Sequence, residues 1–145
     1  MTSAGYSGTP LMKKLGARPG MAALYIGVPE TIEPLWSFAD WGSRDVVERP
    51  PSRTVSGDGR YDFVHVFTKS AAELERALPV LRARLKPAGM IWVSWPKKAA
   101  KIPTDLTEDE VRRMALATGL VDIKVCAVDA VWSGLKLVIP VKDRG

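Results

Sequence analysis

The segment Thr107–Val141, TEDEVRRMALATGLVDIKVCAVDAVWSGLKLVIPV, decides the fold that this sequence predicts. Its first four residues form a capping box that opens a helix, and Gly119 is placed to end that helix. Two apolar strands follow at 121–128 and 135–141, and a short link at 129–134 joins them. A link this short joins antiparallel neighbours, so the chain is expected to end in a helix followed by an antiparallel strand hairpin.

Upstream of this segment, helices and strands alternate. The expected helices are 10–15, 30–39 and 71–85, the last opened by a capping box of Ser70 and Glu73. The expected strands are 21–26, 44–49, 61–67 and 90–95, and a turn is expected at 86–89. Uninterrupted apolar runs such as 21–26 are typical of strands buried on both faces of a parallel sheet. The sequence therefore predicts an α/β fold with a mainly parallel sheet and right-handed crossovers.

The composition indicates a single globular domain. The 145 residues are 46% hydrophobic and 26% charged, which excludes a disordered chain. We expect a flexible N-terminus at 1–8 and one domain over 9–145. The single cysteine excludes a disulfide framework and a multi-thiolate zinc site, and the single histidine excludes paired-histidine metal sites.

Charge and hydropathy limit the location and the partners. No apolar run approaches the roughly 20 residues that a membrane span needs. Residues 1–14 also lack the apolar stretch of a signal peptide. We therefore expect a cytoplasmic protein with no membrane partner. The net charge of +5 permits an anionic partner without identifying one.

Three short phrases resemble the S-adenosylmethionine-dependent methyltransferase fold, in which the last strand runs antiparallel inside the sheet. They are LGARPGM at 15–21, YDFV at 61–64 and LKPAG at 85–89. The resemblance implies a Rossmann-like three-layer sandwich with the terminal hairpin described above. Relative to that fold the chain is shortened by about one strand–helix unit, in the region 44–60.

Six motifs along the chain resemble, in their order, the bacterial Domain of Unknown Function 3052 family. They are SGTPL at 7–11, KKLG at 13–16, WPKK at 95–98, TDLTE at 104–108, KVCAVD at 124–129 and WSGLKLV at 132–138. This resemblance implies the same methyltransferase-like fold. The family has no agreed activity, so the resemblance implies no catalytic residues.

The loop after the first strand departs from what a methyltransferase needs for its cofactor. Gly27 stands alone, since Val28 places a Cβ and Pro29 removes a backbone N–H where an open glycine-rich loop is expected. Asp45 and Glu48 are both candidates for the acidic residue that would hold the ribose hydroxyls. We therefore expect lost or altered cofactor binding, with S-adenosylmethionine possible but disfavoured.

Ligands of open parallel sheets bind beyond the carboxyl ends of the strands. This rule selects the loops at 27–30, 68–70 and 95–98. Trp95 can stack on a planar group while Lys97 and Lys98 neutralise a phosphate, although a core tryptophan followed by solvated lysines fits the same residues. The candidate ligand-binding residues are Gly27, Pro29, Glu30, Trp95, Lys97, Lys98, Thr104, Asp105 and Trp132, and none is assigned to catalysis or to a metal.

Several of these and other polar residues also have a purely structural interpretation. Thr107 can simply cap its helix, and Trp132 can pack under the turn of the expected hairpin link. His65 shares one strand face with two phenylalanines and is expected to be a core residue rather than a general base. Cys126 is expected to be a small buried hydrophobe. The pairs Arg82/Arg84 and Arg112/Arg113 are expected to be solvated.

Three function classes stay open. The leading one is a non-catalytic or degenerate methyltransferase-fold module that binds an anionic small molecule, a nucleotide or a protein partner beside Trp95 and Lys98. The second is an active S-adenosylmethionine-dependent methyltransferase with an atypical cofactor loop. The third is a nucleic-acid-binding protein, which the mixture of 21 basic with 16 acidic residues along the chain makes weaker.

Overall fold

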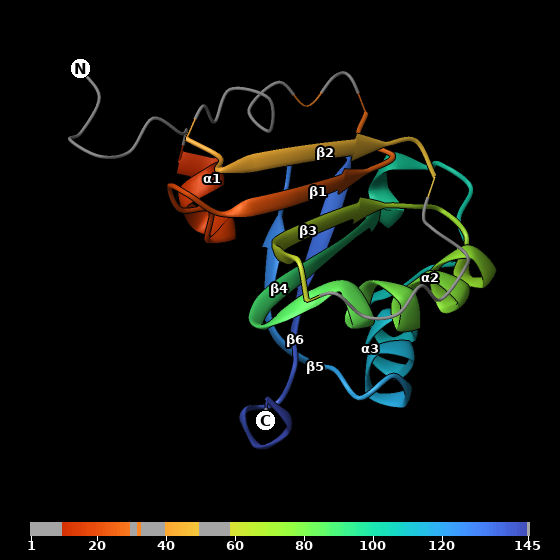
Figure 1. Ribbon diagram of the computed structural model, residues 1–145. Helices are drawn as coiled ribbons and strands as arrows, with labels where there is room; N and C mark the ends of the chain where they lie inside the picture. Colours follow the sequence, from red (N-terminus) through yellow and green to blue (C-terminus); the bar gives the residue numbers. More distant parts are fainter. Residues whose placement is uncertain (1–9, 30–31, 33–39, 50–58, 145) are drawn as a thin grey trace.

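The computed structural model describes residues 10–29, 32, 40–49 and 59–144 (Figure 1). The described residues form a six-stranded sheet with the order β2-β1-β3-β4-β6-β5. The strands are β1 (Ala22–Ile26), β2 (Ser43–Val47), β3 (Tyr61–Phe67), β4 (Leu85–Pro96), β5 (Val121–Ala127) and β6 (Trp132–Val138). The helices are α1 (Pro10–Leu15), α2 (Ala71–Arg84) and α3 (Glu108–Ala117), with short 3₁₀ turns at Lys98–Ala100 and Val141–Asp143. Apart from Ile32, the helix expected at 30–39 lies outside the described residues, and so does the flexible segment expected at 1–8.

The direction of the strands confirms the predicted α/β fold. The pairs β1–β2, β1–β3 and β3–β4 are parallel. The last strand, β6, lies between β4 and β5 and runs antiparallel to both. Within the sheet, β2 lies next to β1 on one side and β3 lies next to β1 on the other. The direction in which strands are added therefore reverses between β1 and β3. At such a point the carboxyl ends of the strands diverge and leave room for a ligand.

Both predicted capping boxes begin helices. The Ser70 hydroxyl accepts a hydrogen bond from the Glu73 backbone N–H over 3.2 Å, and α3 begins in the same way at Thr107. The Glu73 carboxylate does not return to the Ser70 backbone, because it accepts the Thr68 hydroxyl over 2.8 Å. Ser70 N–H donates to the Thr68 hydroxyl instead, over 3.2 Å. This exchange couples the start of α2 to the end of β3.

Each face of the sheet carries its own apolar core. The face covered by α2 and α3 is mainly aliphatic, with Leu74, Leu78 and Val111 fully buried. The face that carries α1 is rich in aromatic residues and includes Tyr25, Phe63, Trp92 and Trp132. Figure 1 shows α1 near the amino ends of the parallel strands, away from α2 and α3. Trp92 joins α1 to the sheet, because its indole N–H donates to the Leu15 carbonyl over 2.8 Å.

One sequence expectation near these strands holds in modified form, and one was wrong. The turn expected at 86–89 lies within the bounds of β4 as an irregularity without strand partners, because Leu85 pairs with Tyr61 and the next pair is Met90 with Phe63. The hairpin link expected at 129–134 ends before Trp132, which already pairs with Pro96. Here the Asp129 carboxylate accepts the backbone N–H groups of Val131 and Trp132 over 2.8 and 2.7 Å, and so closes a shorter turn. Among the described helices, none is long and apolar enough to cross a membrane.

Candidate functional site

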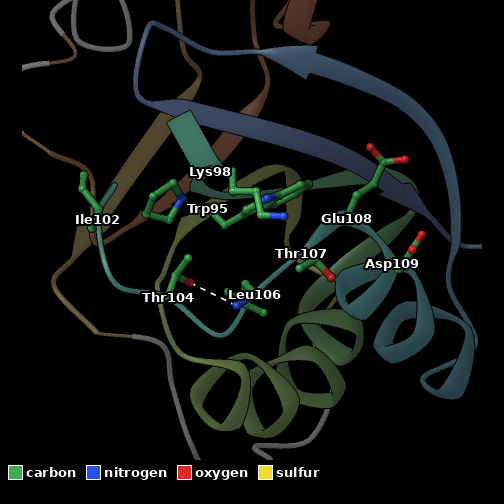
Figure 2. Close-up of a pocket in the computed structure, with 9 residues that line it drawn as sticks. Trp95, Lys98, Ile102, Thr104, Leu106, Thr107, Glu108 and Asp109 are labelled. Carbon is green, nitrogen blue, oxygen red and sulfur yellow. Dashed lines mark hydrogen bonds between the residues drawn. The ribbon is translucent and has the colours of Figure 1, made fainter. Parts of the chain in front are cut away.

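A cavity of about 570 Å³ opens where β4 ends, as the strand-end rule predicts (Figure 2). The residues from β4 to the start of α3 form its wall. It is lined by Trp95, Pro96, Lys98, Ile102, Thr104, Leu106, Thr107, Glu108 and Asp109, and we call it the Trp95 cavity. Figure 2 shows Trp95 and Lys98 between Ile102 on one side and Glu108 and Asp109 on the other.

The two neighbouring lysines take different positions. Lys97 anchors the loop, because its backbone N–H donates to the Val131 carbonyl over 2.7 Å, and its side chain is not among those that line the cavity. Lys98 begins the following 3₁₀ turn, is exposed, and lines the cavity. Trp95 is only 6% exposed and belongs to the aliphatic core. The structure therefore brings Trp95 and Lys98 to one cavity and leaves Lys97 outside it.

The loop residues Thr104 and Asp105 fasten one wall of the cavity to the β3–α2 connection. The Thr104 hydroxyl donates to the Lys69 carbonyl over 2.8 Å and accepts the Leu106 N–H over 3.1 Å. The Asp105 carboxylate accepts the Ala71 N–H over 2.7 Å, at the first residue of α2. Thr104 lines the cavity, whereas Asp105 is used as a second cap for α2.

Acidic residues at the cavity rim are neutralised by one arginine. Arg112 donates to Glu108 over 2.6 Å and to Asp109 over 3.1 Å. Its Nε also donates to Asp122 of β5 over 2.9 Å. The hydrogen bonds to Glu108 and Asp122 raise the pKa of Arg112 above its ordinary value. The expectation of a solvated Arg112 was wrong, because β5 brings Asp122 within hydrogen-bond distance of its guanidinium. The lining of the Trp95 cavity therefore carries both positive and negative charges.

The loop after β1 is shaped by contacts within the sheet. Gly27 has φ +64°, and its N–H donates to the Val47 carbonyl over 2.9 Å. A Cβ at residue 27 would lie 2.8 Å from the Phe67 carbonyl oxygen, so only glycine fits. The Pro29 carbonyl accepts the Ile32 N–H over 3.1 Å. Glu30 lies outside the described residues.

The two acidic candidates of the second strand differ in their surroundings. Asp45 lies within β2, accepts the Tyr61 hydroxyl over 2.5 Å and forms an ion pair with Arg60 at 3.5 Å. Burial and this hydrogen bond to Asp45 raise the pKa of Tyr61 to about 12. Glu48 follows the last residue of β2 and is exposed. Of the two, Glu48 therefore occupies the place where a ribose-binding carboxylate is expected.

Trp132 and His65 lie in the aromatic core and not in the Trp95 cavity. The rings of Trp132 and Phe67 meet edge to face, with 5.2 Å between their centroids. His65 is completely buried, stacks on Phe67 at 4.2 Å, and its Nε2 lies 2.7 Å from Ser94 Oγ. Burial lowers the pKa of His65 to about 3, so the ring is neutral. The expected burial of His65 in the core is confirmed, although its Nδ1 is buried without a hydrogen-bond partner. Cys126 is likewise buried.

Sequence reasoning did not assign Ile102 and Leu106 to the site. The only local signal was that both are apolar residues inside an otherwise polar loop, which is typical of residues that turn back onto the fold. Within the described ranges, no group of three or more His, Cys, Asp or Glu residues could hold a metal ion.

No family model and no curated protein matches the sequence. Among solved structures, the chain is similar to a SAM-dependent methyltransferase from Aquifex aeolicus, with a TM-score of 0.64 and 15% identity over 89% of this chain and 88% of that chain. It is also similar to the glycopeptide N-methyltransferase MtfA complexed with sinefungin, with a TM-score of 0.63 and 13% identity over 89% of this chain and 90% of that one.

The chain has the methyltransferase fold. A putative methyltransferase from Thermoplasma acidophilum is similar in the same way, with a TM-score of 0.60 and 14% identity over 90% of this chain and 74% of that one. Identities of this size carry the fold and not the activity. The resemblance to the Domain of Unknown Function 3052 family stays a prediction.

Proposed function

We propose that this methyltransferase-fold chain is a non-catalytic binding protein whose small-molecule ligand occupies the Trp95 cavity. The observation that carries the proposal is the joint placement of Trp95 and Lys98 in a cavity at the carboxyl end of β4. A volume of about 570 Å³ falls within the roughly 300–1,000 Å³ that is typical of small-molecule sites.

The lining indicates the class of ligand. Trp95, Pro96, Ile102 and Leu106 offer apolar contact for a planar group. Lys98 has no carboxylate partner among the described residues, so its ammonium group is available to an anionic substituent. The ligand is therefore a small planar molecule with one anionic group, of the kind that a nucleotide represents.

The loop after β1 supports a role that does not depend on S-adenosylmethionine. The Gly27 N–H donates to the Val47 carbonyl, and the Phe67 carbonyl packs against the Gly27 Cα. The Gly27 backbone therefore contacts the neighbouring strands, and its N–H is not available to a cofactor. Pro29 has no N–H to offer.

Calorimetry with ADP as the probe tests the proposal. We expect Lys98→Met to weaken ADP binding by about tenfold, the loss of one charge-assisted contact. Lys97→Met is the matched control, because this neighbouring lysine does not line the cavity. Equal losses in the two variants, or no ADP binding by the unmodified chain, would contradict the proposal.

An active methyltransferase is the second candidate, and the position of Glu48 favours it. This exposed carboxylate follows β2 at the edge of the sheet where the loop after β1 begins with Gly27. The Glu48 carbonyl oxygen would lie 3.4 Å from a Cβ on Gly27. If S-adenosylmethionine binds through its ribose here, Glu48→Gln should weaken the binding while Glu75→Gln, an exposed change on α2, should not.

A further inference from the structure

A second cavity, of about 390 Å³, lies near the amino ends of the parallel strands, on the face that carries α1. Four separate parts of the fold meet there: α1, the loop that follows it, β4 and β6. It is lined by Lys13, Gly16, Ala17, Arg18, Met90 and Lys136, and we call it the basic cavity. It shares no lining residue with the Trp95 cavity.

The cations of the basic cavity have no acidic partners in the part of the chain that the structure describes. Among the described residues, none of Lys13, Arg18 and Lys136 forms an ion pair with a carboxylate. Lys124 adds a further positive charge, because it pairs with Lys136 in the β5–β6 register. Four positive charges are therefore gathered without a counter-charge from the described part of the chain.

The carbonyl groups at the end of α1 do not account for these cations. Such carbonyls ordinarily attract lysine and arginine side chains. Here the Leu15 carbonyl accepts the Trp92 indole N–H, and the Lys14 carbonyl accepts Lys124 Nζ over 3.1 Å. The Lys13 carbonyl accepts the Gly16 N–H over 3.1 Å. Lys124 therefore already has a hydrogen-bond acceptor at this helix end. The helix end provides no acceptor for the side chains of Lys13, Arg18 and Lys136.

Lys136 occupies an unfavourable position for an isolated cation. It lies half-buried on β6, and burial together with the charges of Lys124 and Arg18 lowers its pKa below the ordinary value. Lys136 Nζ lies 3.6 Å from the place where a Cβ on Gly16 would be, and Gly16 has φ +88°. Glycine at this position leaves the space beside the ammonium group open. An anion in that space would remove the repulsion between the three side chains.

We propose that the basic cavity binds the phosphate group of a small phosphorylated ligand. A phosphate offers several acceptor oxygens, which allows Lys13, Arg18 and Lys136 to donate to it from different directions. The planar guanidinium of Arg18 suits paired contacts to two phosphate oxygens. A compact cavity with a half-buried lysine favours a single phosphate group over the extended backbone of a nucleic acid, which needs a long basic track.

Calorimetric titration of the full chain with inorganic pyrophosphate at low ionic strength tests the proposal. Lys136→Met keeps the aliphatic stem and removes the charge, so we expect binding to weaken by at least about tenfold. Lys142→Met removes the same charge from an exposed position outside the cavity and should bind pyrophosphate as the unmodified chain does. Lys98→Met reports on the Trp95 cavity: a loss of pyrophosphate binding confined to Lys136→Met assigns the anion to the basic cavity, whereas a loss confined to Lys98→Met would assign it to the Trp95 cavity and overturn this proposal.

Thermal melts provide a second measurement that does not rest on one affinity. Without an anion, Lys136→Met should melt at the same temperature as the unmodified chain or above it, because it relieves repulsion. Pyrophosphate should raise the melting temperature of the unmodified chain and of Lys142→Met, but not that of Lys136→Met. Orthophosphate and ADP serve as further probes: equal affinities assign recognition to the phosphate alone, and tighter ADP binding that Lys136→Met weakens assigns it to a nucleotide.

Two further results would overturn the proposal. One is the absence of pyrophosphate binding, or an equal loss in Lys136→Met and Lys142→Met, which indicates unspecific attraction by net charge. The other is tighter binding of a single-stranded oligonucleotide than of pyrophosphate, with an equal loss of oligonucleotide affinity in all three lysine variants. That outcome would assign the basic residues to a dispersed nucleic-acid surface instead.

Discussion

Gly27 at the end of β1 and Phe67 at the end of β3 approach so closely that a Cβ on Gly27 would lie 2.8 Å from the Phe67 carbonyl oxygen. The contact lies beside the reversal of strand order, the point at which open α/β sheets bind ligands. Gly27 therefore allows the ends of β1 and β3 to pack closely together, at the position where a cofactor-binding loop would otherwise begin.

Replacement of Gly27 by alanine should destabilise the chain more than replacement of Gly20. Both glycines have positive φ, +64° and +84°, so both substitutions incur about 1–2 kcal/mol of backbone strain. Only Gly27→Ala also meets a backbone atom, since nothing lies within 4 Å of a Cβ on Gly20. Urea unfolding of both variants gives the difference. Equal losses of unfolding free energy would show that the Phe67 contact relaxes at no cost.

S-adenosylmethionine should bind weakly. The Gly27 N–H already donates to Val47, and Pro29 has none. We expect a dissociation constant of about 100 μM or worse, which corresponds to roughly 5.5 kcal/mol of binding free energy. Calorimetry measures it directly, and a low-micromolar constant would favour the active methyltransferase.

The lysines beside Trp95 should contribute little to stability, whereas Trp95 itself should contribute much. Replacing both Lys97 and Lys98 by alanine should change the unfolding free energy by less than about 1 kcal/mol, as at other surface sites. Trp95 is 6% exposed, and Trp95→Ala should cost roughly 3–5 kcal/mol. Thermal melts beside the ADP titration separate the two effects. A double-lysine variant that melts far below the unmodified chain would contradict the assignment of this loop to binding.

His65 should make stability depend on pH below neutrality. Its folded pKa of about 3 lies below the unfolded value of about 6.5, so the unfolded chain binds one more proton between these values. Stability should be complete above pH 6.5 and should fall as the pH decreases through this window, by up to about 1.4 kcal/mol per pH unit. Because the chain has a single histidine, His65→Phe should remove this slope between pH 5.5 and 6.5, which urea unfolding at several pH values measures. An unchanged slope would assign it to the carboxylates.

Arg112 should support ligand binding through the rim of the Trp95 cavity. Arg112→Met leaves the carboxylates of Glu108 and Asp109 without their partner, so an anionic probe such as ADP should bind several-fold more weakly. Arg113→Met is the control, since Arg113 pairs with Glu110, which does not line the cavity. If both variants bind ADP as the unmodified chain does, the rim charges do not reach the ligand.

Local patterns were sufficient for much of the fold. The strand Tyr61–Phe67 and the caps at Ser70 and Thr107 were predicted where the structure has them, because apolar runs and capping residues act over a few neighbours in sequence. Local patterns did not predict that β4 begins at Leu85, before the turn expected at 86–89. The distant Tyr61 pairs with Leu85, and residues 86–89 form an irregularity without strand partners before Met90 pairs with Phe63.

For this protein, the sequence by itself determined the order of elements, the antiparallel ending and the strand-end loop that carries Trp95 and Lys98. Only the tertiary structure decided which side chains meet. It placed Trp132 against Phe67 on one face of the sheet and Trp95 in the cavity on the other, although each tryptophan lies near one end of its strand. It also brought Lys13, Arg18 and Lys136 together from parts of the chain more than a hundred residues apart. Strand register and helix docking set such contacts, and neither is encoded in the spacing of any one segment.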